Sequence, residues 1–127
     1  MKFEFSDEKA LVPSAMVGAP STYKIVLNET DEPNVITEHE RETKNGLGKF
    51  KQYSLHLENK EKEKCVANFL FQKQFKQLAT TVSKDSKDWE HTYVEIMGVP
   101  EEKGDKIYHN LDIKPVGIPT WAEEIVK

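Results

Sequence analysis

Phe50 lies between Lys49 and Lys51, so one short segment combines an aromatic ring with two positive charges. Single-stranded nucleic acid is bound by such groups, because every base offers a π face for stacking and every phosphate attracts a cation. In an extended strand, Phe50 would point away from the side that carries Tyr53. We therefore expect an outward stacking ring; the alternative is a residue at the start of a strand that the N-terminal segment covers.

The same chemistry singles out further rings and lysines along the chain. Tyr93 and Tyr108 alternate with apolar neighbours, so we expect both rings to point outward, either toward a ligand or into ordinary surface packing. Lysines beside them contact phosphates or are simply solvated. Arg41 is the only arginine among 18 basic residues, which predicts weak sequence specificity because arginine usually reads guanine edges. The candidate nucleic-acid-binding residues are Lys44, Lys49, Phe50, Lys51, Lys64, Tyr93, Lys103, Lys106 and Tyr108.

Groups that could carry catalysis or hold a metal are scattered along the chain. Cys65 is the only cysteine and lies in a predicted strand, where a buried, inert thiol is expected rather than a nucleophile. Adjacent carboxylates such as Glu101 and Glu102 fall in a predicted loop, without the burial that a general acid requires. We predict no enzymatic activity, no metal and no cofactor. The histidines lack the spacing of a metal site: His39, His56, His91 and His109.

The composition is that of one small folded domain with an uneven charge. Its 127 residues are 37% hydrophobic and 31% charged, which is enough apolar material for a single core. The formal net charge is −4, yet residues 44–84 carry +6 and the segments 1–43 and 85–127 carry −5 each. The basic middle third fits a phosphate-facing surface or a solvated lysine-rich hairpin and helix. A single cysteine and the lack of long apolar runs predict a cytoplasmic protein without a membrane partner.

Strands must position these candidate residues, and the apolar pattern predicts five of them. Pro33 interrupts the first, which is therefore one long bent strand or two short ones. Asn45-Gly46 predicts a hairpin turn before the second, where Leu55 and Leu57 alternate with polar residues. The predicted strands span residues 23–43, 52–58, 64–71, 93–97 and 107–114.

One helix is predicted between the third and fourth strands. Its apolar residues recur at helical spacing, namely Phe71, Phe75, Leu78, Ala79 and Val82. Residues 98–106 contain proline and glycine and predict a loop, and Pro115 is expected to end the last strand. Four rings are expected in the core: Tyr53, Phe69, Phe75 and Trp89.

The element order and three local patterns resemble small OB-fold proteins of phages and archaeal mobile elements that are similar to single-stranded-DNA-binding proteins. The first pattern is the Gly46-Leu47-Gly48 turn before the second strand. A polar stretch at residues 83–88 then leads to a tryptophan, and the last strand has the form tyrosine-x-asparagine-hydrophobic-x-isoleucine at residues 108–113. The resemblance covers roughly residues 20–115.

This resemblance implies a mostly β, five-stranded OB-fold barrel with one helix between strands three and four, whose ligands lie across strands two and three. The predicted organisation is an irregular N-terminal arm (1–21), the OB-fold domain (22–115) and a C-terminal tail (116–127). We expect non-catalytic binding of single-stranded nucleic acid, most simply DNA. The alternative is a protein-interaction module or adaptor subunit of a phage, viral or replication assembly. Trp121 in the tail either plugs the barrel or docks onto a protein partner.

Overall fold

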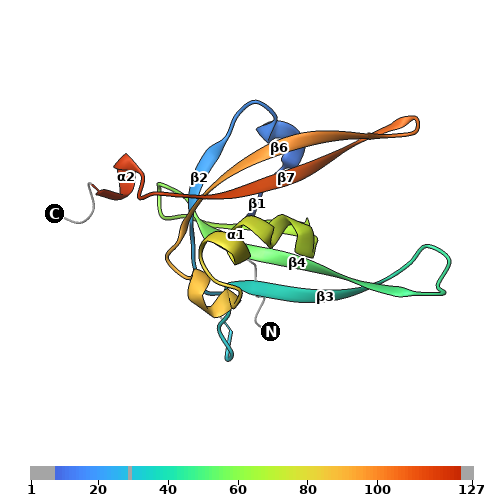
Figure 1. Ribbon diagram of the computed structural model, residues 1–127, viewed down its shortest axis with the longest axis horizontal. Helices are drawn as coiled ribbons and strands as arrows, with labels where there is room; N and C mark the ends of the chain where they lie inside the picture. Colours follow the sequence, from blue (N-terminus) through green and yellow to red (C-terminus); the bar gives the residue numbers. More distant parts are fainter. Residues whose placement is uncertain (1–7, 29, 124–127) are drawn as a thin grey trace, which may run out of the picture.

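The computed structural model describes residues 8–28 and 30–123, which form a mostly β fold (Figure 1). Four short helical segments and one slightly longer helix accompany the strands: η1 (Pro13–Met16), η2 (Gln72–Phe75), α1 (Lys76–Thr81), η3 (Ser86–Trp89) and α2 (Thr120–Glu123). The strands are β1 (Lys9–Ala10), β2 (Ser21–Ile25), β3 (Ile36–Glu42), β4 (Lys49–Glu58), β5 (Lys64–Leu70), β6 (Tyr93–Lys103) and β7 (Lys106–Val116).

The strands form one curled, open sheet that resembles half of a barrel. Their order is β1-β5-β4-β2-β6-β7, and β3 pairs with β4 beyond the end of β2. Among the described strands no pairing joins β5 to β7, so the sheet does not close on itself. The predicted mostly β class is confirmed. The predicted number of five strands is wrong, because the segment 23–43 divides into two strands and the N-terminal segment adds β1.

The division of segment 23–43 follows from the turn around Pro33. The side-chain oxygen of Asn28 accepts a hydrogen bond from the Asn34 N–H at 3.0 Å and one from the Thr30 hydroxyl at 3.1 Å. The Asn28 N–H in turn donates to the Asn34 carbonyl at 2.9 Å. This turn redirects the chain, so that β2 pairs with the end of β4 and β3 with its beginning. The interruption is confirmed, with two strands as the outcome.

Two long hairpins project toward the same side of the molecule (Figure 1). We name them the β3–β4 arm (residues 38–53) and the β6–β7 arm (residues 98–111). The first turns at Gly46, whose φ is 72°, as the Asn45-Gly46 pattern predicts. The second turns within two residues, Gly104 and Asp105, and Gly104 has a φ of 62°.

The β6–β7 arm corrects two predictions. Residues 98–106 are not a loop, because β6 continues to Lys103 and β7 begins at Lys106. Pro115 does not end the last strand but pairs with Val94 inside it. The missing N–H of a proline is tolerated there because β7 is the last strand of the sheet, where one side of the backbone needs no partner.

The core lies between the concave face of the sheet and the helical segment that follows β5. The predicted helix exists, but only Phe75 and Leu78 of its stripe are fully buried, while Phe71 and Val82 lie outside α1 and are exposed. Of the predicted core rings, Trp89 is buried as expected, and its Nε1–H donates to the Ser83 carbonyl at 2.8 Å.

Phe69 is not in the core, because it is 67% exposed. The most deeply buried side chains are Ile25, Val35, Leu55, Leu57, Leu70, Leu78, Val94, Ile96 and Ile113.

The described part of the N-terminal segment, residues 8–19, spans the unclosed side of the sheet. β1 pairs in parallel with β5, and η1 then packs against β6, where Val17 bridges Gly98. Met16 enters the core from this segment. A Cβ on Gly98 would lie 2.0 Å from the Pro13 carbonyl oxygen, so this approach requires a glycine. No helix among residues 8–28 and 30–123 is long and apolar enough to span a membrane.

We predict that Gly98→Ala lowers the free energy of unfolding by about 1–3 kcal/mol, because the added methyl group forces η1 away from β6. Urea denaturation measures the change. Gly117→Ala is the matched control, since its Cβ would meet no atom within 4 Å, and it should stay within about 0.5 kcal/mol of the wild type. Equal losses in both variants would contradict the packing of η1 on Gly98.

Candidate functional site

Most of the predicted nucleic-acid-binding residues lie on the two arms. On the β3–β4 arm, Lys44 belongs to the turn, and the segment from Lys49 to Lys51 begins β4. On the β6–β7 arm, Lys103 and Lys106 flank the turn, and Tyr108 follows in β7. The two arms project toward the same end of the molecule (Figure 1), and a gap lined by Lys51 of one arm and Lys103 of the other lies between them. Folding therefore brings together Lys44, Lys49, Phe50, Lys51, Lys103, Lys106 and Tyr108 at one end of the molecule.

Lys64 and Tyr93 lie at the other end. Lys64 pairs with Glu58 next to the β4–β5 turn, and Tyr93 pairs with Val116 at the far end of the β6–β7 hairpin. Glu101 faces Tyr108 across the hairpin. Tyr93 precedes Glu101 on β6 by a distance of about 26 Å, at roughly 3.3 Å per residue. The Tyr93 ring instead meets the half-buried Trp121 edge-on, with the ring centroids 5.6 Å apart. These two predicted residues are not brought to the gap.

Three of the predicted lysines on the arms are paired with carboxylates. Across the hairpin, Lys49 Nζ lies 3.7 Å from a carboxylate oxygen of Glu40. Lys51 Nζ lies 3.2 Å from a carboxylate oxygen of Glu38. The hydrogen bond with Glu38 raises the pKa of Lys51. Lys103 lies 3.6 Å from Glu101. The alternating glutamates of β3 face Lys49 and Lys51 of β4 across a predictable hairpin register, a signal in the sequence that reasoning from single residues missed.

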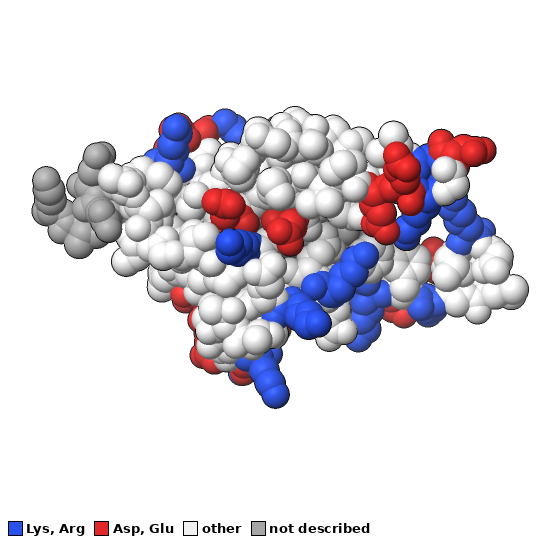
Figure 2. Space-filling view, turned by 45° about the horizontal axis from the view of Figure 1, so that its top comes forward, with Lys and Arg blue, Asp and Glu red and all other residues white. Residues whose placement is uncertain are grey.

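A groove between the arms continues past α1. Its two halves have volumes of about 580 and 470 Å³ and share the lining residues Tyr53, Gln72 and Lys73. We name it the lysine groove. No carboxylate belongs to the described residues that line either half. Figure 2 shows lysine and arginine side chains gathered beside the gap between the arms, with carboxylates along its upper edge. The lysines of the groove are Lys51, Lys73, Lys76, Lys84 and Lys103.

Lys73, Lys76 and Lys84 are the lysines of the groove that were not predicted. For none of the three does a described carboxylate lie within 4.0 Å, so their charges face the groove without a paired neighbour. They come from η2, α1 and the segment before η3. The basic middle third of the sequence was the signal for them, but their common side depends on how the helical segment packs on the sheet.

Three exposed rings line a second hollow, between β5 and β7, and a fourth lies beside it. Phe69, Phe71 and Tyr108 line it together with the N-terminal residues 10–13. We name this hollow the aromatic opening. Phe50 lies beside it, with its ring centroid 6.3 Å from that of Phe71, and is therefore covered in part by Phe71. Phe71 lines both the aromatic opening and the lysine groove, so the two hollows adjoin.

Gln74 fixes the wall between η2 and the edge of β7. Its side-chain oxygen accepts a hydrogen bond from the Phe71 N–H at 2.6 Å, and its side-chain nitrogen donates to the Leu111 carbonyl at 2.9 Å. The latter bond joins the two sides of the sheet where strand pairing between β5 and β7 is missing. One half-buried amide thus replaces part of a strand ladder.

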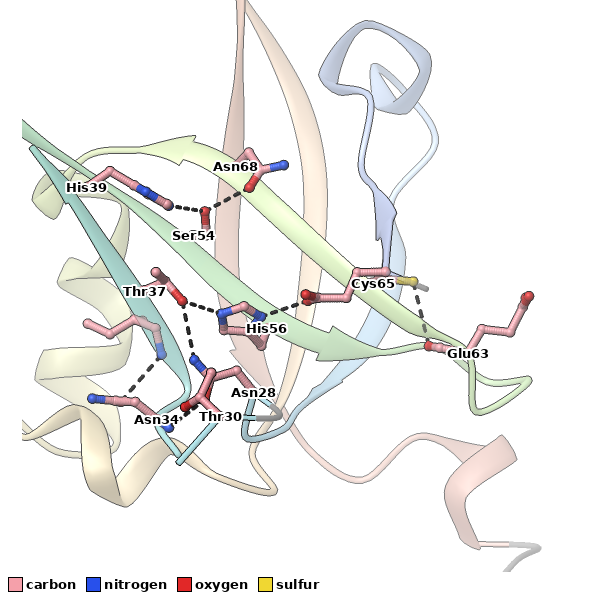
Figure 3. Close-up of polar contacts among 12 residues, drawn as sticks. Asn28, Thr30, Asn34, Thr37, His39, Ser54, His56, Glu63, Cys65 and Asn68 are labelled. Atoms are coloured by element: carbon pink, nitrogen blue, oxygen red, sulfur yellow. Dashed lines mark hydrogen bonds and ion pairs between the residues drawn. The ribbon is translucent and has the colours of Figure 1, made fainter. Parts of the chain in front are cut away.

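The outer face of β4 holds a buried polar network (Figure 3). His56 is buried, with Nδ1 2.7 Å from a Glu8 carboxylate oxygen and Nε2 2.7 Å from the Thr37 hydroxyl. Ser54 is also buried and donates to the Asn68 side-chain oxygen at 2.7 Å. Both ring nitrogens of His56 have partners, so the network ties residue 8, β3 and β4 together. The polar side chains that alternate with Leu55 and Leu57 on β4 are therefore buried at these two residues.

The one thiol of the chain lies in the same part of the sheet. Cys65 is 3% exposed, and burial raises the pKa of its thiol. A thiol that stays protonated near neutral pH is a poor nucleophile, because the thiolate is the reactive form.

Comparison of the chain with protein-family models, curated proteins and solved structures gave no match.

We predict that Gln74→Leu lowers the free energy of unfolding by about 1–3 kcal/mol, because the Leu111 carbonyl and the Phe71 N–H both lose a partner. Chemical denaturation measures the loss. Gln77→Leu, at an exposed position of α1, is the matched control and should change stability by less than about 0.5 kcal/mol. If the two variants are equally stable, the bridge between η2 and β7 does not contribute as described.

Proposed function

We propose that the protein is a non-catalytic binder of single-stranded nucleic acid built on an OB-type half-barrel. The strand order supports the OB assignment when β2 and β3 are counted as one bent first strand. The order is then third, second, first, fourth, fifth, with α1 between the third and fourth strands. Both arms end in the turns that flank the ligand in OB-fold proteins, between strands one and two and between strands four and five.

The lysine groove carries the functional proposal. It offers cations for phosphates, the half-buried ring of Tyr53 and no lining carboxylate among the described residues, although the whole chain has a formal charge of −4. Phosphates respond to the local field, so an acidic total does not prevent binding in a basic groove. Exposed rings next to the groove favour unpaired bases over duplex, because the bases of a duplex are already stacked.

The groove supports weak sequence specificity. Among the described residues that line the groove, all the charged ones are lysines, which act on phosphates as point charges and lack the planar fork with which arginine reads guanine. A protein of this kind recognises single strands of many sequences, and DNA and RNA remain equivalent for the contacts described.

A protein-interaction module is the second candidate function. Exposed apolar side chains at the arm tips favour it, since Leu47 is 87% exposed in one turn and Ile107 is 60% exposed beside the other. Apolar side chains at the tips of paired arms suit contact with a protein surface. This candidate does not account for the lysines of the groove, and we rank it second for that reason.

We predict that wild-type protein binds fluorescein-labelled oligo-dT and that the affinity falls steeply as the salt concentration rises, as measured by fluorescence anisotropy. Lys73→Glu/Lys76→Glu should reduce affinity on the order of tenfold or more. It should also reduce the slope of log affinity against log salt by about 1.4, at roughly 0.7 per phosphate contact on a single strand. Lys60→Glu/Lys114→Glu, outside the groove, has the same net charge and should bind nearly as wild type.

Two results would reject the proposal. The first is that wild-type protein binds no oligonucleotide even at low salt, which would leave the groove without its ligand. Alternatively, the two double variants could lose affinity equally, in which case the effect is one of total charge and the groove is not the binding site. Recovery of a protein partner after nuclease treatment, without binding to oligonucleotides, would favour the second candidate function.

A further inference from the structure

We propose that Phe69 is the base-stacking residue of this protein, displayed by a strained β-bulge at the rim of the aromatic opening. The proposal rests on single-stranded nucleic acid as the ligand and identifies where one of its unpaired bases is held. From the sequence, Phe69 is expected in the core, and the structure places it outside.

A bulge in β5 turns the ring outward. Tyr53 pairs with Leu70 and Leu55 pairs with Ala67, so two steps along β4 correspond to three along β5. The extra residue breaks the alternation of sides. The Phe69 side chain is 67% exposed, the largest exposed fraction of any described aromatic ring, compared with 46% for Tyr108.

The backbone at the bulge is in a conformation that an aromatic residue rarely adopts. Phe69 has a φ of 59°, in the left-handed region that glycine and asparagine occupy easily and bulky residues avoid. Such strain persists where the surrounding structure enforces it, and it is found most often at functional sites. Here Asn68 anchors the bulge, because its side-chain oxygen accepts a hydrogen bond from the Ser54 hydroxyl. The Ser54 hydroxyl oxygen in turn lies 3.0 Å from His39 Nε2 (Figure 3).

The charges next to the bulge select the ligand. Phe71 lines both the aromatic opening and the lysine groove, so a strand whose phosphates contact Lys51 and Lys73 lies beside the Phe69 ring. A protein segment would bury the same rings but would leave Lys73, which has no described carboxylate within 4.0 Å, without a partner. An unpaired base with its phosphate satisfies both surfaces, and we therefore assign the aromatic opening to single-stranded nucleic acid.

The test measures the affinities of three probes for Phe69→Ala: oligo-dT, an abasic backbone of the same length and a duplex. We expect oligo-dT affinity to fall about 5- to 150-fold, which corresponds to the loss of about 1–3 kcal/mol of stacking. Affinities for the abasic backbone and the duplex should stay within about twofold, because neither offers an unstacked base. Ile118→Ala, an exposed apolar residue beyond β7, is the matched control and should bind all three probes as wild type.

A second variant separates stacking from a structural role of the ring. Phe69→Asn removes the ring and relieves the strain, because asparagine tolerates positive φ. We expect its unfolding temperature to equal or exceed that of the wild type while its affinity for oligo-dT falls as in Phe69→Ala. A clear decrease in the unfolding temperature would show that the ring is needed for folding, and would overturn the proposal.

The remaining outcomes distinguish this proposal from the proposed function. If wild-type protein binds no oligonucleotide, the proposed function fails and the assignment of Phe69 fails with it. If wild type binds oligo-dT and Phe69→Ala binds equally well, only the assignment of Phe69 is overturned. An equal loss for oligo-dT and the abasic backbone would also overturn it. The assignment is also overturned if Phe69→Ala converts a dimer of the protein into monomers yet keeps its affinity for oligo-dT, because the ring would then join two copies of the chain.

Discussion

The curled sheet lacks a direct connection between β5 and β7, and the two adjoining hollows follow from this constraint. Backbone groups at a sheet edge need a partner or water. Along part of this side, the chain supplies substitutes: β1 pairs with β5, η1 covers β6, and Gln74 bonds to the Leu111 carbonyl. Where these substitutes end, the arms diverge, and the aromatic opening and the lysine groove lie side by side.

Charge is partitioned locally in this molecule. The glutamates of β3 lie opposite lysines of β4 in the same hairpin, and Glu38 and Glu40 each meet one of them. Their fields largely cancel within that arm. The lysines of the helical segment have no such partners in the described structure and dominate the groove beside it. A net charge is thus a poor guide to a surface on which the paired and the unpaired charges belong to different elements.

Features determined by neighbouring residues could be predicted from the sequence, and features determined by tertiary packing could not. The Asn45-Gly46 turn and the buried Leu55 and Leu57 follow from local rules of turns and alternation. His56 has the same polar pattern as a solvated residue, but the N-terminal segment covers it. The bulge turns outward the Phe69 ring, which is expected in the core from the sequence. The side shared by the groove lysines depends on how the helical segment docks.

The bridge between Val17 and Gly98 has a consequence for biosynthesis. These residues are 81 positions apart, so the N-terminal segment leaves the ribosome long before the strand that receives it has been made. Until β6 forms, Leu11 and Met16 have no complete core to enter. Contacts between distant segments form late because the intervening chain must first be ordered. Residues 8–19 are therefore synthesised before β6 but can dock on it only after it has been made, and the unfinished chain exposes their apolar side chains in the meantime.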